Sequence, residues 1–259
     1  MTALLPLLLA LLPVAPPTEV PPQLKCLVES YPGALCSATA TELVWCDGTR
    51  MPYRTGSQRT AHAERLANGD LADQMRQVYT PFVPATQPAV DQEPGRIRNQ
   101  AFFAKLYGRT QAEVLAHTTR LTWLDGKTLR VTTRFGIDQR LAAVRDELRN
   151  LPAKVAAPAF QTEGTLVWRT IRGTTRRSAH AYAMAIDVGV PVSDYWQWHA
   201  PDAQGKLPFR NRMPIEVVRV FEKHGFVWGG RWYHYDTMHF EFRPELLHPA
   251  CVGGAAGQP

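Results

Sequence analysis

Two short segments, far apart in the chain, carry histidines and acids in alternating patterns that constrain the fold more than any other feature. The first, residues 178–187, is Ser-Ala-His-Ala-Tyr-Ala-Met-Ala-Ile-Asp, and the second, residues 236–241, is Asp-Thr-Met-His-Phe-Glu. From Ala183 to Gly189, small and acidic residues alternate with Met184, Ile186 and Val188. This period of two predicts a strand with Asp187 on the face opposite its apolar neighbours. His180 then lies in the loop that enters the strand.

The second segment predicts a strand of the same kind. His239 and Glu241 share one face, whereas the phenylalanines beside them point to the core. A catalytic zinc site usually has three protein ligands and an open position for water. We expect one such ion per chain, held by His180, Asp187 and His239. Asp236 lies three residues before His239, near enough to take a proton from a water that the metal acidifies.

Together the two segments resemble the zinc D-alanyl-D-alanine carboxypeptidase family, which includes the vancomycin-resistance dipeptidases and the L-alanyl-D-glutamate endopeptidases of phage and bacteria. The resemblance covers residues 164–247 well and the upstream half more loosely. It rests on the pattern formed by Ser178, His180, Ala185, Asp187, Asp236, His239, Phe240 and Glu241. It implies that the two histidines and Asp187 bind zinc and that Asp236 is the base. The joint pattern is specific, whereas either half alone is weak support.

The resemblance also implies residues around the metal. In the family, an arginine that follows a strand upstream of the first zinc ligand contacts the substrate and steadies the developing oxyanion. Arg169 is our first choice for this role and Arg176 the second, because a guanidinium stays charged and offers several donors. Glu241 is expected to orient a ligand imidazole from behind, and Ser178 to support the site from the same outer position. Weaker candidates for substrate contact are Arg176, Tyr195, Trp196 and Trp228.

Ala183 departs from the family, which usually has glycine at this position. We expect its methyl group to tighten packing near the site and to narrow the substrate cleft without abolishing the chemistry. Among the remaining histidines, His234 is the one expected to approach the cleft, because it flanks Asp236.

Helical and strand patterns are mixed without a regular β-α-β rhythm, which favours an α+β fold with a mainly antiparallel sheet and flanking helices. The resemblance implies a Hedgehog/D-Ala-D-Ala-peptidase-like catalytic domain. We assign residues 1–23 to a signal peptide and 24–157 to a helical and strand extension packed on the catalytic part. Residues 158–250 are assigned to the zinc peptidase domain and 251–259 to a flexible tail.

Periodicity predicts several individual elements. A helical stripe runs from Val114 through Thr118 to Leu121, with Thr110 as its N-cap. Residues 158–165 are expected to be a linker. Helices are also predicted over 138–151 and 214–224, and strands over 127–134, 166–168 and 226–228.

An apolar run from Leu4 to Val14 is too short to cross a membrane, which needs about 20 residues, and fits the core of a signal peptide. We therefore expect an exported protein, periplasmic or extracellular, without a stable membrane span. An even number of cysteines in such a chain predicts up to two disulfides, with reduced, buried cysteines as the alternative. A bridge from Cys251 to the N-terminal cluster would tie the chain ends together. Three pairings are open for Cys26, Cys36, Cys46 and Cys251.

The formal net charge of +6 fits an anionic cell wall as well as nucleic acid. The arginines are scattered, and neither zinc-finger spacing nor an RNA-binding aromatic motif accompanies them, so we expect no nucleic-acid partner. The predicted function is hydrolysis of peptidoglycan stem peptides, at the D-alanyl-D-alanine bond as a carboxypeptidase. Two alternatives stay open: an L-alanyl-D-glutamate endopeptidase with the same zinc centre, and a non-catalytic zinc-containing cell-wall binding module. The sequence predicts no oligomeric state.

Overall fold

A four-stranded antiparallel sheet carries the two segments. Its order is β6 (Thr162–Gly164), β7 (Ala185–Val188), β9 (His239–Phe242) and β8 (Phe226–Trp228). The computed structural model describes residues 19–56 and 59–252. Strand β7 pairs with β9 in a register that sets Asp187 opposite His239. Because successive side chains point to opposite faces of a strand, the next pair, Ile186 and Phe240, points into the core, where both are fully buried.

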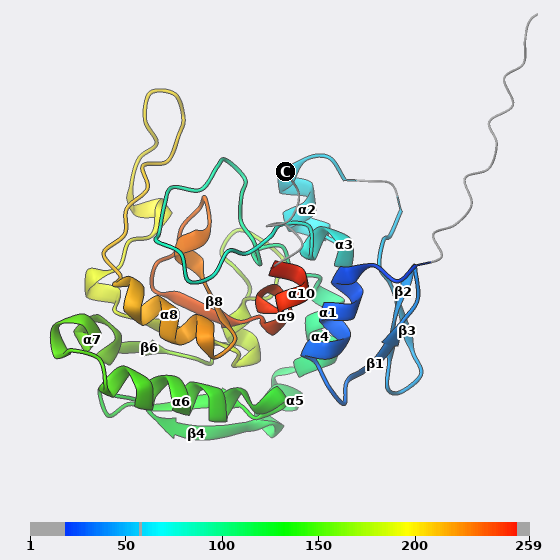
Figure 1. The fold of residues 1–259 in the computed structure, drawn as a ribbon, viewed down its shortest axis with the longest axis horizontal. Coiled ribbons are helices and arrows are strands. Elements are labelled where there is room, and N and C mark those ends of the chain that lie inside the picture. Colours follow the sequence, from blue (N-terminus) through cyan, green and yellow to red (C-terminus); the bar gives the residue numbers. More distant parts are fainter. Residues whose placement is uncertain (1–18, 57–58, 253–259) are drawn as a thin grey trace, which may run out of the picture.

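Helices cover the apolar side of this sheet (Figure 1). Helix α8 (Ile215–Lys223) packs on β8, on α6 (Ile137–Arg149) and on α7 (Ala153–Phe160). The ring of Phe221 in α8 stacks on Phe240 in β9 with their centroids 3.9 Å apart. The α+β class and the predicted helices over 138–151 and 214–224 are confirmed.

Two smaller antiparallel sheets accompany the main one. Strands β1 (Leu35–Ala38), β2 (Glu42–Trp45) and β3 (Arg50–Pro52) form the first, and β4 (Thr118–Thr122) and β5 (Thr128–Thr132) form the second. The other helices are α1 (Pro22–Ser30), α2 (His62–Asn68), α3 (Leu71–Gln74), α4 (Gln100–Tyr107), α5 (Gln111–Ala116), α9 (Pro244–Leu247) and α10 (Pro249–Val252). Short 3₁₀ helices are η1 (Arg134–Gly136), η2 (Ala179–Tyr182), η3 (Val190–Val192), η4 (Trp196–Trp198) and η5 (Gly229–Arg231).

Two disulfides join the four cysteines. Cys26 in α1 pairs with Cys251 in α10, and Cys36 in β1 pairs with Cys46 just after β2. Helices α1 and α10 therefore lie side by side, although they come from opposite ends of the chain (Figure 1). The expected tie between the chain ends is confirmed.

Three expected elements differ in the structure. Helix α5, capped by Thr110 as expected, stops before Thr118–Thr122, which pairs with β5 as strand β4. Its β-branched threonines favour a pleated strand over a helix. The expected linker over 158–165 instead contains the end of α7 and strand β6. Residues 166–168 lie outside the strands, after Gly164, whose φ of 112° ends β6.

Both expected terminal segments lie largely outside the described residues. Of the expected signal peptide, residues 1–18 are not described and residues 22–23 belong to α1. Of the expected tail, residues 251–252 belong to α10 and the rest is not described. Within residues 19–56 and 59–252, no helix combines the length and the apolar character needed to cross a lipid bilayer.

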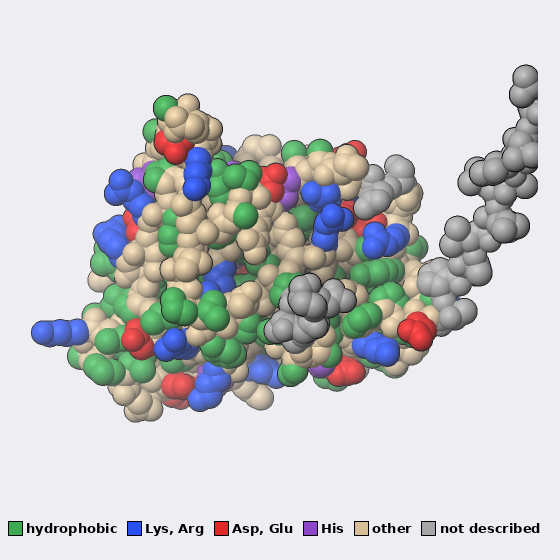
Figure 2. All heavy atoms as spheres, turned by 45° about the horizontal axis from the view of Figure 1, so that its top comes forward, with side chains coloured by type: hydrophobic (Ala, Val, Ile, Leu, Met, Phe, Trp, Pro, Cys, Tyr) green, Lys and Arg blue, Asp and Glu red, His purple; other side chains and the backbone are tan. Residues whose placement is uncertain are grey.

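Charged side chains are mixed on the face that Figure 2 shows. There the lysines and arginines (blue) lie singly or in small groups, separated by apolar and acidic side chains. The net charge of +6 is therefore not gathered into one basic patch on this face.

Candidate active site

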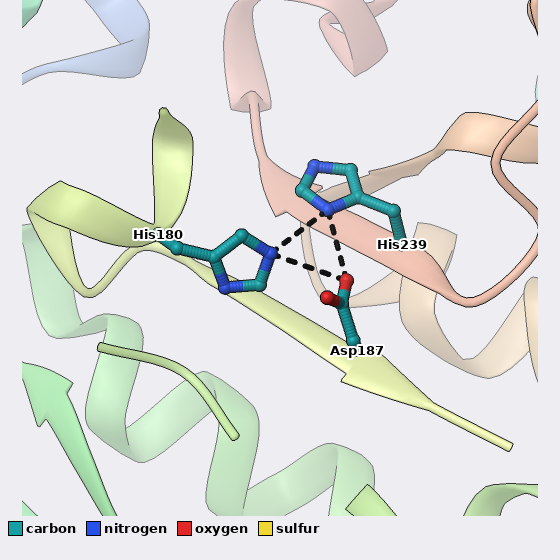
Figure 3. Close-up of side chains that lie close together, drawn as sticks. All are labelled: His180, Asp187 and His239. Atoms are coloured by element: carbon teal, nitrogen blue, oxygen red, sulfur yellow. Dashed lines mark hydrogen bonds and ion pairs between the residues drawn. The ribbon is translucent and has the colours of Figure 1, made fainter. Parts of the chain in front are cut away.

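Strands β7 and β9 and the turn before β7 bring three side chains to one point (Figure 3). His239 Nδ1 lies 3.0 Å from Asp187 Oδ1, in keeping with the direct pairing of the two residues across the strands. His180 comes from η2, and its Nε2 lies 3.2 Å from Asp187 Oδ1 and 3.1 Å from His239 Nδ1. These three atoms form a group that could hold a metal ion.

A residue in the left-handed backbone conformation ends the turn that carries His180. Ala183 has φ 53° and ψ 27°, and its N–H donates to the carbonyl of His180. A residue with a Cβ is disfavoured in this conformation by about 1–2 kcal/mol, whereas glycine is not. The expectation that this methyl group narrows the cleft was wrong, because Ala183 is buried and does not line the cavity. The Cβ of Ala183 instead makes the left-handed backbone conformation at this position less favourable.

The second nitrogen of each imidazole is held by a hydrogen bond. His180 Nδ1 lies 2.9 Å from the backbone oxygen of Thr165, and His239 Nε2 lies 3.0 Å from Glu241 Oε2. When each ring is neutral and its N–H at this position donates to the oxygen, the other ring nitrogen faces Asp187 and can bind a metal ion. Metal-binding histidines are typically fixed in this way.

The surroundings of His239 favour a positive charge. Burial alone would lower its pKa, but hydrogen bonds to Asp187 and Glu241 and their charges outweigh burial and raise the pKa of His239 to about 10. The two carboxylates thus attract a cation to this point, either a proton on the ring or a metal ion beside it. Because a metal must displace that proton, its binding is expected to depend on pH.

Glu241 connects the site to the protein interior. Its side chain is fully buried, and it accepts from Arg98 Nη1 at 2.6 Å and from Arg243 Nη1 at 3.1 Å in addition to His239. Burial by itself would raise the pKa of Glu241, but Arg98, the hydrogen bond from His239 and Arg243 hold it well below its usual range. Glu241 is therefore a fixed carboxylate that orients His239 from behind.

Asp236 lies at the turn before β9 and faces the cavity. Its N–H donates to Gly229 O at 3.0 Å, and its Oδ1 is buried without a hydrogen-bond partner among the described residues. Burial and then the charge of Asp187 raise the pKa of Asp236 to about 6. Because an unpaired buried carboxylate disfavours folding, such a group is typical of a residue retained for proton transfer.

The close approach of two turns sets the position of Asp236. A Cβ added at Gly229 would lie 2.5 Å from the carbonyl oxygen of Asp236 and 3.2 Å from its Cβ. Any larger residue at this point would displace the turn. Gly229 thus lets the backbone turn close to the site.

A cavity of about 270 Å³ opens over the ligand group. The predicted residues that line it are Arg169, Arg176, Ser178, His180, Asp187, Tyr195, Trp196, Asp236 and His239. Arg169 is exposed, whereas Arg176 is buried. Three further arginines line the same cavity: Arg96, Arg98 and Arg172. The arrangement therefore joins a group that could bind a metal, an unpaired acid and a cluster of guanidinium groups.

Residues 172–242 match the D-alanyl-D-alanine carboxypeptidase family. This family belongs to the M15 group of zinc peptidases, so the resemblance expected from the two segments is confirmed. The matched segment contains the three ligands, Asp236 and Glu241, and begins after Arg169. No curated protein and no solved structure matches the chain.

Trp228 does not belong to this site. It pairs with Phe240 across β8 and β9 and thus lies on the core side of the sheet, where it is fully buried. Its Nε1 donates to Thr237 O at 2.9 Å. The expectation that Trp228 contacts substrate was wrong, because no part of its side chain is exposed.

Several residues around the site were missing from the predicted set. Trp232 lines the cavity, with its ring centroid 5.6 Å from that of His239, and its Nε1 donates to Pro94 O. His234 also lines the cavity, as expected from its position beside Asp236. The arginines at 96 and 98 come from a segment outside the family match. Each lines the cavity and is also paired with a glutamate.

Proposed function

We propose that this chain is a zinc-dependent peptidase that hydrolyses peptidoglycan stem peptides, removing the terminal residue of D-alanyl-D-alanine as a carboxypeptidase. The observation that supports it most is the convergence of His180, Asp187 and His239 beside the unpaired Asp236, all within the segment that matches the family. The proposal includes a Hedgehog/D-Ala-D-Ala-peptidase-like catalytic part over residues 158–250, on which residues 24–157 pack as an extension.

The donor set suits zinc. Two imidazole nitrogens and one carboxylate oxygen are a common ligand set for catalytic zinc, which keeps a fourth position open. Bonds of about 2.0–2.1 Å at tetrahedral angles place ligand atoms about 3.3 Å from one another. The three separations here are 3.0, 3.1 and 3.2 Å, so the side chains need little movement to bind the ion. When bound, zinc supplies an acidified water and polarises the scissile carbonyl.

Asp236 takes the proton from the attacking water and passes it to the leaving amine. Its raised pKa suits both halves of this transfer, because a base works best with a pKa near the working pH. Arg169 binds the terminal carboxylate of the substrate or the developing oxyanion. Its exposed guanidinium lines the cavity and makes no ion pair with the described residues, so it is available for either contact. Ser178, Tyr195 and Trp196 form part of the wall.

Export of the protein is part of the proposal. Two disulfides persist in oxidising compartments and are rare in the cytosol. Peptidoglycan is also outside the cytoplasmic membrane, so a periplasmic or extracellular location fits both the bridges and the substrate.

Hydrolysis of purified muropeptides, followed by mass spectrometry, tests the proposal. The zinc-loaded protein should remove one terminal D-alanine, chelation should abolish this activity, and added zinc should restore it. Cleavage between L-alanine and D-glutamate would replace the carboxypeptidase with an endopeptidase that uses the same centre. If a sample shown to contain zinc cleaves no muropeptide, the proposed activity is wrong and a non-catalytic wall-binding module takes its place.

A further inference from the structure

Arg176 is a buried cation with no partner among the described residues. Its side chain lines the cavity, only 8% of the residue is exposed, and its guanidinium makes no hydrogen bond or ion pair within residues 19–56 and 59–252. Burial, and then the charges of Arg98 and Arg96, lower the pKa of Arg176 to about 10. Placing an unpaired charge in such surroundings disfavours the folded state, so a ligand that pairs with it gains binding free energy.

The two neighbouring arginines are already neutralised. Arg98 Nη1 lies 2.6 Å from Glu241 Oε2, and Arg96 pairs with Glu93, which also accepts from His62 at 2.7 Å. These ion pairs hold both guanidinium groups in place beside the cavity. Arg176 thus stands next to fixed arginines whose own carboxylates are engaged elsewhere.

A charge count for the cavity leaves a surplus of positive charge. Asp187 and Asp236 together balance one divalent metal ion. Arg169, Arg172 and Arg176 then remain without an acidic partner among the described residues. One terminal carboxylate on the substrate balances only one of these three cations. The cavity is therefore built for a ligand that carries more than one negative charge.

We propose that Arg176 binds a second carboxylate of the substrate. This subsite selects peptides with a free acidic group in addition to the one at their C-terminus. This inference rests on the proposed function, because it describes the substrate of the same site. A planar guanidinium binds a carboxylate through two parallel hydrogen bonds, and a neutral carboxamide cannot accept both in that way. Stem peptides offer such groups on D-glutamate and, where present, on diaminopimelate, and each can be free or amidated.

Three synthetic stem pentapeptides test this selectivity on the unmodified zinc-loaded protein. The first carries both internal carboxylates free, the second has the D-glutamate carboxyl amidated, and the third has the diaminopimelate carboxyl amidated. We expect kcat/KM to fall by about 10- to 100-fold for one of the two amides, the loss of one charge-assisted pair. If both amides are hydrolysed as fast as the free acid, the subsite does not exist.

Substitution then assigns the preference to Arg176. In Arg176→Gln the free acid should be hydrolysed as slowly as the sensitive amide, while kcat/KM for that amide changes little. Arg176→Lys should keep part of the preference, because it keeps the charge but not the two parallel donors. Arg120→Gln is the matched control, since Arg120 is exposed in β4 and outside the cavity. If the glutamine variant keeps the full preference, Arg176 is not the residue responsible.

Binding measurements separate this inference from the proposed function. The free and amidated peptides can be titrated into Asp236→Asn by calorimetry, where no turnover is needed. If the wild type cleaves none of the peptides but the variant still binds the free acid more tightly, the proposed activity fails and the subsite stands. If cleavage occurs without any preference in rate or in binding, the subsite fails and the proposed activity stands.

Discussion

Buried charges on the two sides of the His239 imidazole are treated in opposite ways. Behind the imidazole, on the side of Nε2, a network that we call the rear ion network consists of Arg98, Glu241, Arg243 and Glu245, each almost fully or fully buried. Its carboxylates accept from two or three donors apiece, including Tyr31 Oη on Glu245 at 2.7 Å. In front, Asp236 Oδ1 and the Arg176 guanidinium have no partner among the described residues.

This difference separates charges that hold the fold together from charges kept for a substrate. Within the rear ion network, Arg243 Nη2 is buried without a hydrogen-bond partner among the described residues, and that guanidinium lies 5.0 Å from the ring centroid of Phe103. Removing a paired buried charge strands its partner, which destabilises the protein. Removing an unpaired buried charge relieves its unfavourable burial and instead lowers catalysis or substrate binding. Substitutions in the rear ion network should therefore lower the free energy of unfolding, whereas substitutions of the unpaired charges in front should raise it.

Asp236→Asn gives the largest expected effect and tests the front side. Loss of the base should lower kcat by about 1000-fold, while the zinc content stays unchanged. The folded-state pKa of about 6 lies above the unfolded value of about 3.9, so ionisation of Asp236 disfavours folding as pH rises through this window. The metal-free variant should therefore melt at a higher temperature than the wild type at pH 7.

Asp194→Asn is the matched control for this substitution. Asp194 is also buried and near the site, but it pairs with Arg212 at 3.2 Å and does not line the cavity. The control should lose stability and keep its turnover. If Asp236→Asn retains activity within tenfold of the wild type, the assignment of the base is wrong.

Glu241→Gln tests the rear side. It leaves two buried arginines with a neutral partner, and we expect the free energy of unfolding to fall by about 3 kcal/mol. Because Glu241 also orients His239, the affinity for zinc should fall by about 10- to 100-fold. Urea unfolding of the metal-free protein and competition with a zinc chelator measure the two effects separately.

Glu222→Gln supplies the comparison for the zinc measurement. Glu222 is buried and accepts from Tyr79 at 2.6 Å and Arg231 at 2.7 Å, away from the ligand group. Its loss should destabilise the protein by a similar amount without changing zinc affinity. Equal losses of zinc affinity in both variants would mean that Glu241 acts on the metal only through overall stability.

Acid should weaken the rear ion network only below about pH 4.3, after the pH has passed the pKa of about 6 at Asp236 in front. The pKa of Glu241 is held well below its usual range, so its stabilising contribution is complete above the unfolded value of about 4.3 and is lost as pH falls below it. Glu93 behaves alike, because hydrogen bonds from His234 and His62 and the charge of Arg96 outweigh burial and keep its pKa low. Each such carboxylate adds up to about 1.4 kcal/mol per pH unit to the slope of unfolding free energy.

This pH dependence can be assigned to one residue. Urea unfolding of the metal-free wild type between pH 6 and pH 3 should show stability falling with pH. The slope in Glu241→Gln should be shallower, since one proton fewer is taken up on unfolding in this range. An unchanged slope would show that the pKa of Glu241 is the same in the folded and the unfolded protein.

The front side was far more predictable from the sequence than the rear. His239 and Asp187 each lie in a strand whose alternation is local, so their shared face followed from a few residues. Helices α6 and α8 were likewise predicted from their own periodicity. The pairing of Arg98 with Glu241 spans 143 positions in the sequence, and no local pattern encodes such a contact. The sequence therefore did not predict that the arginines at 96 and 98 lie at the cavity.

Tertiary pairing explains the elements that were predicted wrongly. The stripe through Thr118 and Leu121 has helical spacing, yet β5 offers hydrogen bonds to Thr118–Thr122 and this pairing decides the conformation. Leu121 is buried in either form, so burial alone could not distinguish them. In α7, Pro158 lies inside the helix, where it cannot donate to the carbonyl four residues earlier, and the helix ends two residues later.

Ala183 shows the same limit at a single residue, and it gives the smallest expected effect. The sequence identified it as a departure from glycine, but only the backbone shows that the position has φ 53°. Ala183→Gly should raise the free energy of unfolding by roughly 0.5–1 kcal/mol, since the relief of the left-handed strain exceeds the added freedom of the unfolded chain. Ala181→Gly in η2, where φ is not positive, should lower it instead. If both glycine variants lose stability equally, the turn that carries His180 is not strained at Ala183.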